Sequence, residues 1–275
     1  MLDLHHPLVE SVLVPGALSI GLIGLGRRFD RKHRLDALAI GIAFIISAVI
    51  IIDRPLWPSR SALEKLPLAL AGYLLLGLGL TVRAAPTRIV MSLATVGMIL
   101  TILWLAWAQL YRSDTFWEVG GLGILGIVLL LRVSTAQCAG VNSAIKLGVA
   151  AFGLSGVAII SGSMLIGEIA GSLASVVLGS LLLRRHSDST TSLVFSGTLP
   201  FVSVTSLCVL LTDAPPLAIA TLVVVFFVDG FKSPVSGTTR HSTKPLTVAL
   251  RACALTGAAI GIALLTDSPS DLYYG

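Results

Sequence analysis

Apolar segments long enough to cross a membrane recur along the whole chain, and this feature restricts its possible folds more than any other. A helix needs about 20 apolar residues to cross a hydrocarbon core roughly 30 Å thick, because it rises about 1.5 Å per residue. Only 12% of the residues are charged, against roughly 25% in soluble domains. The sequence therefore predicts an all-α integral membrane protein, a single polytopic domain over residues 1–275 with about ten transmembrane helices. The predicted spans are residues 8–26, 36–53, 66–82, 89–110, 117–132, 146–162, 166–183, 192–211, 216–231 and 246–265.

The stretch from Leu147 to Leu183 decides the number of spans. It contains no Lys or Arg and one acidic residue. As one helix it would be about 55 Å long, which is too long for a single crossing. We therefore predict a tight turn near Ser161-Gly162-Ser163 between two spans.

Most of the positive charge falls on one side of this arrangement, where the loops and the span ends beside them hold 15 of the 19 Lys and Arg residues. Basic loops stay on the cytoplasmic side of a membrane. We therefore expect a multi-pass protein of a bacterial inner membrane with both termini outside. The predicted cytoplasmic loops are 27–35, 83–88, 133–145, 184–191 and 232–245. Short basic loops beside membrane ends do not form a nucleic-acid-binding face, so the lipid bilayer is the expected partner, with anionic lipid a candidate at these loops.

The eighth predicted span, residues 192–211, is the least hydrocarbon-like, because it holds many hydroxyl side chains. Four of its serines form a serine stripe within roughly 80° of one another on a helix: Ser192, Ser196, Ser203 and Ser206. Pro200 has no N–H for the carbonyl of Ser196, which leaves a backbone acceptor on the same helix. Two interpretations stay open. Ser196, Pro200, Ser203 and Ser206 line a solute path, or the hydroxyls bond along and between helices and stabilise packing.

Three acidic residues, Glu10, Glu118 and Glu168, lie near the outer starts of predicted spans. Helix N-terminal amides favour negative charge, so an interfacial role is one interpretation. A carboxylate in lipid is costly and usually functional, so Glu10 and Glu168 are also candidates to bind an ion or a solute. Asp229 precedes Lys232 by three residues, a spacing that predicts a local ion pair.

Small residues recur every four positions in the seventh predicted span, at Gly167, Gly171, Ser175 and Gly179. Such a pattern lets two membrane helices approach closely, and we interpret it as a packing surface with a substrate groove as the alternative. Gly257 and Gly261 repeat the pattern once in the last span, and we predict packing there too.

All four tryptophans, Trp57, Trp104, Trp107 and Trp117, map to the predicted outer ends of spans. Their rings have an apolar body and a polar tip, which suits the membrane interface. We expect an interfacial belt, and an external docking surface is the alternative.

No catalytic residue, cofactor or metal site is predicted. Gly153-Leu154-Ser155-Gly156 matches a GxSG motif of intramembrane serine proteases, but such a serine needs a base, and the five histidines all fall outside the predicted spans. The cysteines Cys138, Cys208 and Cys253 are isolated, which argues against a disulfide framework or a metal knuckle.

These observations favour a carrier or permease for a small solute. The alternative is a structural or assembly subunit of a membrane complex, acting as a homo-oligomer or with a partner membrane subunit. An intramembrane lipid-modifying enzyme is a third reading, which the lack of a converging acid and base disfavours. A carrier should have a polar path beside Ser196 and Ser203, whereas a subunit should have a dry core there.

Overall fold

A computed structural model describes residues 9–29, 36–52, 61–83, 85–110, 113–135, 141–183, 193–230 and 245–266. Every regular element in these ranges is a helix, which confirms the all-α prediction. Seven of the described helices are long and apolar enough to cross a membrane. The chain is thus built as a multi-pass helical membrane protein.

The helices follow the order of the predicted spans. They are η1 (Val9–Leu13), α1 (Val14–Phe29), α2 (Asp36–Ile52), α3 (Ala62–Val82), α4 (Thr87–Ala106), α5 (Ser113–Thr135), α6 (Val141–Ile160), α7 (Met164–Leu183), η2 (Val194–Thr198), α9 (Leu199–Leu211), α10 (Pro216–Val224), η3 (Val225–Gly230) and α11 (Pro245–Thr266). Three apolar segments are shorter than a full span: Ser11–Leu25, Ala39–Ile52 and Pro216–Val228. That all ten segments cross the bilayer therefore stays a prediction.

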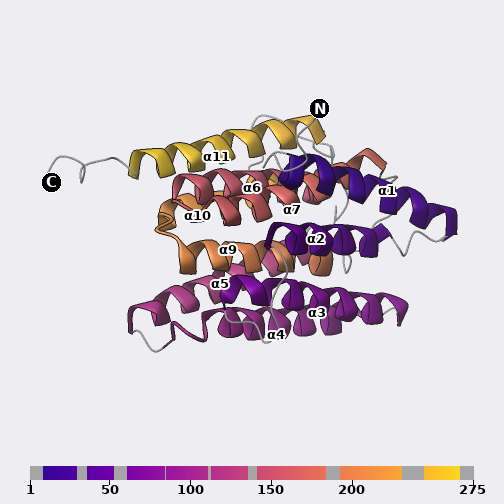
Figure 1. Ribbon diagram of the computed structural model, residues 1–275, viewed down its shortest axis with the longest axis horizontal. Coiled ribbons are helices and arrows are strands. Elements are labelled where there is room, and N and C mark those ends of the chain that lie inside the picture. Colours follow the sequence, from indigo (N-terminus) through magenta and orange to yellow (C-terminus); the bar gives the residue numbers. More distant parts are fainter. Residues whose placement is uncertain are drawn as a thin grey trace, which may run out of the picture.

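The helices lie side by side in a bundle (Figure 1). The helix α11 forms one edge of the view, α3 and α4 form the opposite edge, and α9 runs between them. The largest packing surfaces join α6 to α7, α6 to α11, and α1 to α7. Of these pairs, only α6 and α7 are consecutive, and their short connection makes them antiparallel neighbours.

Three helices begin four or five residues earlier than their apolar segments suggest, and one of them is α5, which starts at Ser113 rather than 117. The helix α3 starts at Ala62 rather than 66, because Ser61 and Glu64 form a capping box in which the Ser61 hydroxyl accepts from the Glu64 N–H at 3.2 Å. The helix α6 starts at Val141 rather than 146. Lys146, which the sequence places at a loop, therefore lies within the helix and is only 3% exposed.

The helices α6 and α7 are separated at Ser161–Ser163, where the length of the apolar stretch requires a turn. The turn is closed by the N–H of Ser163, which donates to the carbonyl of Ala158 at 2.9 Å. Gly162 has φ 86°, in the left-handed region where a side chain is unfavourable. A glycine is needed at this position for so tight a connection.

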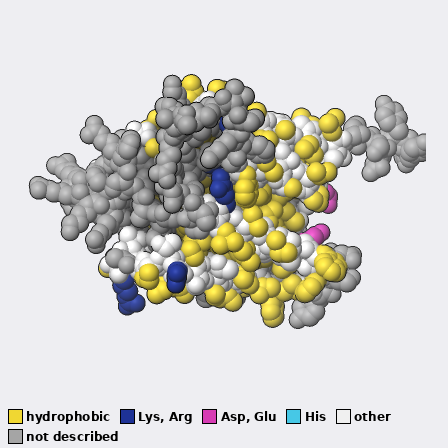
Figure 2. Space-filling model, turned by 180° about the vertical axis from the view of Figure 1, so that it is seen from behind, with side chains coloured by type: hydrophobic (Ala, Val, Ile, Leu, Met, Phe, Trp, Pro, Cys, Tyr) yellow, Lys and Arg dark blue, Asp and Glu magenta, His cyan; other side chains and the backbone are white. Residues whose placement is uncertain are grey.

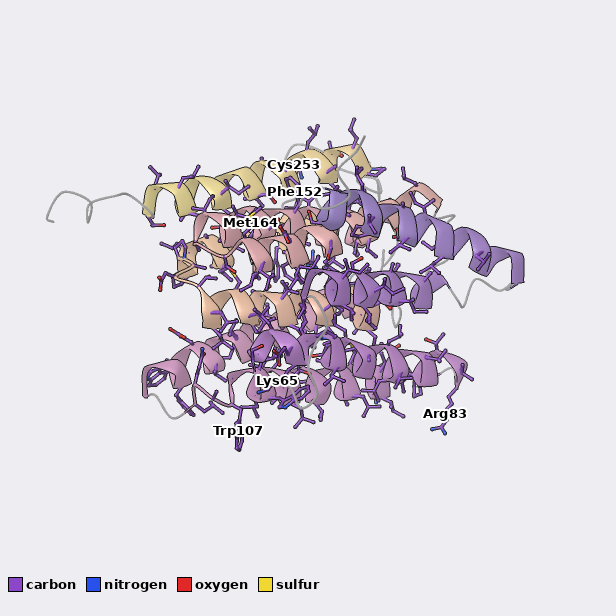
Figure 3. The ribbon with its side chains drawn as sticks, viewed as in Figure 1. Lys65, Arg83, Trp107, Phe152, Met164 and Cys253 are labelled. Atoms are coloured by element: carbon purple, nitrogen blue, oxygen red, sulfur yellow. The ribbon has the colours of Figure 1, made fainter. Side chains whose placement is uncertain are left out.

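The acidic and most of the basic side chains that can be seen on one face lie apart along the bundle (Figure 2), with Lys65 an exception (Figure 3). Seen from behind in Figure 2, Asp and Glu side chains lie at the right-hand edge, and the visible Lys and Arg side chains lie to their left. Figure 3 places Arg83 at the opposite end from Lys65 and Trp107. We call the end that holds Arg83 the basic end, and the end that holds Trp107 the aromatic end. The basic end corresponds to the predicted cytoplasmic side.

Trp104, Trp107 and Trp117 are all exposed. The Lys65 ammonium donates to the carbonyl of Trp104 at 3.0 Å and lies 5.8 Å from the centre of its ring. An amphipathic ring beside a basic side chain is typical of the membrane interface. Trp57 lies outside the described residues.

Candidate functional site

The continuous helix formed by η2 and α9 is the most enclosed of the membrane-length helices. Its residues Val194–Leu211 are 89% buried inside the protein, whereas α3 and α11 reach only 33% and 28%. Together η2 and α9 contact the helices α2, α3, α4, α5, α6 and α7. Any polar group on this helix therefore faces other helices rather than lipid, and must find its partners there.

The serine stripe is buried along this helix. The Ser203 hydroxyl donates to the Leu199 carbonyl at 3.1 Å, and the Ser206 hydroxyl donates to the Val202 carbonyl at 2.8 Å. Ser196 is also buried and has its own partner. Ser192 lies outside the described residues. These bonds within one helix hold the hydroxyls in place and leave their oxygens able to accept further hydrogen bonds.

The break that Pro200 introduces takes the form of a π-helical turn. The N–H of Leu199 donates to the carbonyl of Val194, five residues earlier, and the Thr198 hydroxyl donates to the Leu193 carbonyl at 3.3 Å. Since Pro200 has no N–H, the regular bond to Ser196 is missing. The wider turn places the irregular backbone inside the protein, where other helices surround it. The sequence predicted an interrupted helix at this position, but not its π-helical form.

A tyrosine from α3 meets the middle of α9. The Tyr73 and Ser203 hydroxyl oxygens are 3.2 Å apart, and the Thr101 side chain of α4 lies beside the same phenol. Either hydroxyl can donate in this bond, and Tyr73 is the donor when Ser203 gives its one proton to the Leu199 carbonyl. We call these three side chains the hydroxyl cluster. All three are buried, with exposed fractions of 3% for Tyr73, 7% for Thr101 and 1% for Ser203.

Sequence reasoning found Ser203 but missed Tyr73 and Thr101. A signal for Tyr73 was present, since it lies in the middle of a predicted span rather than at an interface, where tyrosine is usual. A phenol at that depth needs a hydrogen-bonding partner on another helix. Which helix supplies that partner depends on how the helices pack.

On the basic-end side of the hydroxyl cluster, η2 packs closely against neighbouring helices. A Cβ atom added to Gly77 of α3 would lie 2.8 Å from the Cβ of Phe195. A Cβ added to Gly197 would lie 2.5 Å from a methyl carbon of Leu147 on α6. Glycines thus allow α3 and α6 to approach the π-helical turn closely, as small residues do in membrane interfaces.

At the aromatic end, a side chain from the segment after α4 holds the end of α9. The Gln109 amide donates to the Leu210 carbonyl at 2.9 Å. That carbonyl belongs to the last turn of the helix, where acceptors lack a partner within the helix. The helix α9 is therefore held at three levels, by close packing, by the hydroxyl cluster and by Gln109.

The predicted carboxylates do not join this site. Glu118 is in the second turn of α5 and exposed, and Glu168 is in the second turn of α7, half-buried and bonded to other groups. Glu10 lies in η1, but its side chain is outside the described residues. The side chain of Asp229 and all of Lys232 are outside them too, so their predicted pair is not described.

The small-residue strip of α7 lies at two helix interfaces. A Cβ added to Gly171 would lie 3.3 Å from the Ser155 hydroxyl of α6, and one added to Gly179 would lie 3.2 Å from the Gly16 carbonyl of α1. The Ser155 hydroxyl, part of the GxSG sequence, donates to the Gly167 carbonyl at 2.6 Å. It links α6 to α7. Ser175 donates to the Gly171 carbonyl of its own helix at 2.9 Å.

The second small-residue pattern has a different position. A Cβ added to Gly257 or Gly261 of α11 would meet no atom within 4 Å. These glycines face away from the other described helices, so they make no packing contact there, and a packing role for them stays a prediction. The physical reason is that α11 contacts α6, α10 and η3 through its other face.

Within the described ranges, no group of three or more His, Cys, Asp or Glu residues is placed to hold a metal ion. Comparison of the chain with protein-family models, with curated proteins and with solved structures finds no match in any of the three. A fold class alone does not identify an activity, so the function must be argued from the site.

Proposed function

We propose that the protein is a carrier for a small polar solute, with its path along the serine face of α9. The observation that carries the proposal is the enclosed, Pro-interrupted helix with its buried hydroxyl cluster. Irregular helices near the centre of a bundle form the binding sites of many transporters. Hydroxyls both donate and accept hydrogen bonds, which suits an uncharged polar solute.

In this conformation the path is closed, since Ser196, Ser203 and Ser206 are all buried. A carrier that works by alternating access passes through such closed states. The proposal therefore requires a second conformation, in which the hydroxyl cluster exchanges the Tyr73 to Ser203 bond for a bond to solute. By the charge pattern we place the protein in a bacterial inner membrane with its basic end in the cytoplasm.

Transport into proteoliposomes tests this function, with a panel of radiolabelled sugars, polyols, neutral amino acids and nucleosides. The double variant Ser196→Leu with Ser203→Leu should abolish uptake of any compound that the parent protein accumulates. The matched control is Ser172→Leu with Ser180→Leu on α7. Those serines are equally buried and also bond to carbonyls of their own helix. Equal loss of uptake in both double variants would contradict a path along α9.

The alternative is a structural or assembly subunit, either as a homo-oligomer or with a partner membrane subunit. It is favoured by the same hydroxyls, because Ser203 and Ser206 already have partners within the bundle. The open glycines of α11 would then suit a helix of another chain. Failure of every panel compound, together with a stable complex recovered by mild detergent extraction, would favour this alternative over transport.

A further inference from the structure

The π-helical turn of η2 has a bulky buried side chain on the basic-end side of the hydroxyl cluster. Phe195 is 1% exposed and lies in η2, eight residues before Ser203. On a helix that separation is roughly 12 Å. The turn is therefore on the basic-end side of the hydroxyl cluster, near the end from which α9 begins.

The partner of Phe195 is a glycine of α3. Gly77 follows Tyr73 by one helical turn in the direction of the basic end. A Cβ added to Gly77 would lie 2.8 Å from the Cβ and 3.2 Å from the Cγ of Phe195, so only glycine permits this approach. Two contacts thus join α3 to the central helix, a hydrogen bond at Ser203 and an apolar contact at Phe195.

The backbone that holds Phe195 is suited to movement. Its π-helical turn precedes Pro200, so the helix lacks the regular hydrogen bond that would stiffen it. Phe195 and Gly77 make an apolar contact through the phenyl ring and the glycine backbone. Separating them breaks no hydrogen bond between these two residues, because their contact is apolar.

We propose that the contact between Phe195 and Gly77 closes the solute path on the basic-end side of the hydroxyl cluster. The inference rests on the proposed carrier function and adds the residue pair that controls access to it. Opening moves Phe195 away from α3 and exposes Ser203 to water from that end. Closing returns the ring to Gly77.

The test is the accessibility of Ser203 in the full-length protein reconstituted in lipid vesicles. The parent carries Cys138→Ser, Cys208→Ala and Cys253→Ser, with Ser203→Cys as the only thiol. A membrane-impermeant methanethiosulfonate reagent is added to either side, and the rate of labelling is measured. Two variants are made in this parent. In Gly77→Ala the added methyl group displaces Phe195, and in Phe195→Ala the ring is removed. The matched control is Gly79→Ala on the same helix, where a Cβ would meet no atom within 4 Å.

A closed carrier exposes its site in a minor state of roughly 0.1–10% of molecules, so either variant should raise labelling about tenfold or more. The increase should come only from the basic-end side, and Gly79→Ala should stay within about twofold of the parent. Thermal stability in detergent identifies any variant that fails to fold. If Gly77→Ala does not fold, Phe195→Ala decides the test, because it creates space rather than overlap.

Two other results overturn the inference, and they differ in what they imply for transport. If the parent is readily labelled and neither folded variant changes the rate, the closure lies elsewhere and the carrier function stands. If no folded variant is labelled from either side, while the unfolded protein is, then Ser203 lies on no aqueous path and both proposals fail.

Discussion

The helices α9 and α11 have nearly the same mean hydropathy and occupy opposite environments. The segment Val194–Leu211 is 89% buried inside the protein, whereas Pro245–Thr266 is 28% buried and lies at the edge of the bundle (Figure 1). Lipid tails are as apolar as leucine side chains, so hydrophobicity does not decide which helix other helices surround. Close packing and hydrogen bonds between helices decide it.

The two helices differ in how they meet their neighbours. The central helix has Ser203 bonded to Tyr73, Gly197 against Leu147 and Phe201 beside Phe226. On α11, a Cβ atom added to Gly257 or Gly261 would meet no atom of the described residues within 4 Å. A central position in this bundle is thus associated with shape complementarity and polar partners, and an edge position with their absence on one face.

Truncating a large side chain should give the largest difference between α9 and α11 in the free energy of unfolding. Phe201 is buried in α9 with its ring centre 5.7 Å from that of Phe226. Phe201→Ala should lower the free energy of unfolding by about 3 kcal/mol, because it leaves a cavity. Leu250→Ala on the exposed face of α11 should change it by less than about 0.5 kcal/mol. Equilibrium unfolding in mixed micelles measures both, and equal losses would contradict the difference in environment.

Replacing a glycine by alanine should have opposite effects on stability in the small-residue strip of α7 and at the glycines of α11. A Cβ at Gly179 of α7 would meet the backbone of Gly16, which cannot rotate away, so Gly179→Ala should destabilise the protein by about 2 kcal/mol. Gly257→Ala meets nothing and should stabilise it by about 0.5 kcal/mol through helix propensity. The same unfolding measurement applies. A destabilising Gly257→Ala would indicate that α11 packs against a second chain.

The labelling rates of two native cysteines measure the difference in burial between α9 and α11. Cys208 is buried in α9, and Cys253 is exposed on α11 (Figure 3). In detergent micelles and in a Cys138→Ser background, a small apolar maleimide should label Cys253 about tenfold faster than Cys208, because access limits thiol reactivity. Mass spectrometry of tryptic peptides measures the two rates. In denaturant they should become equal, and unequal rates there would mean that local chemistry, not burial, controls the labelling.

The smallest expected effect is that of the hydrogen bond between α3 and α9. Tyr73→Phe and Ser203→Ala should each cost about 0.6 kcal/mol, the average for such bonds between membrane helices. The double variant should cost less than the sum, because both changes remove the same bond. Thr266→Ala, at the exposed end of α11, is the control and should have no measurable effect. Additive losses in the double-mutant cycle would show that the two hydroxyls are not coupled.

The sequence by itself determined the properties that depend on the transfer of apolar segments from water into lipid. Apolar length predicted the helices, and the length of the stretch from Leu147 to Leu183 predicted a turn, where the structure has Gly162 in the left-handed region. Hydropathy located helix ends less well, because the polar first turns of α3 and α6 extend beyond the apolar segments. Ser203 and Pro200 were found because a hydroxyl or a proline in a membrane helix demands a partner or a break.

Only the tertiary structure decided what those groups meet. It placed α9 between the other helices, brought Ser203 and Thr101 to Tyr73, set Phe195 against Gly77, and buried Lys146 in α6. None of these contacts can be predicted from the hydropathy of a segment, because an apolar surface that faces lipid and one that faces another helix have the same composition. They depend on which surfaces fit closely enough to pack and on which polar atoms lie within bonding distance, and both are properties of the assembled bundle.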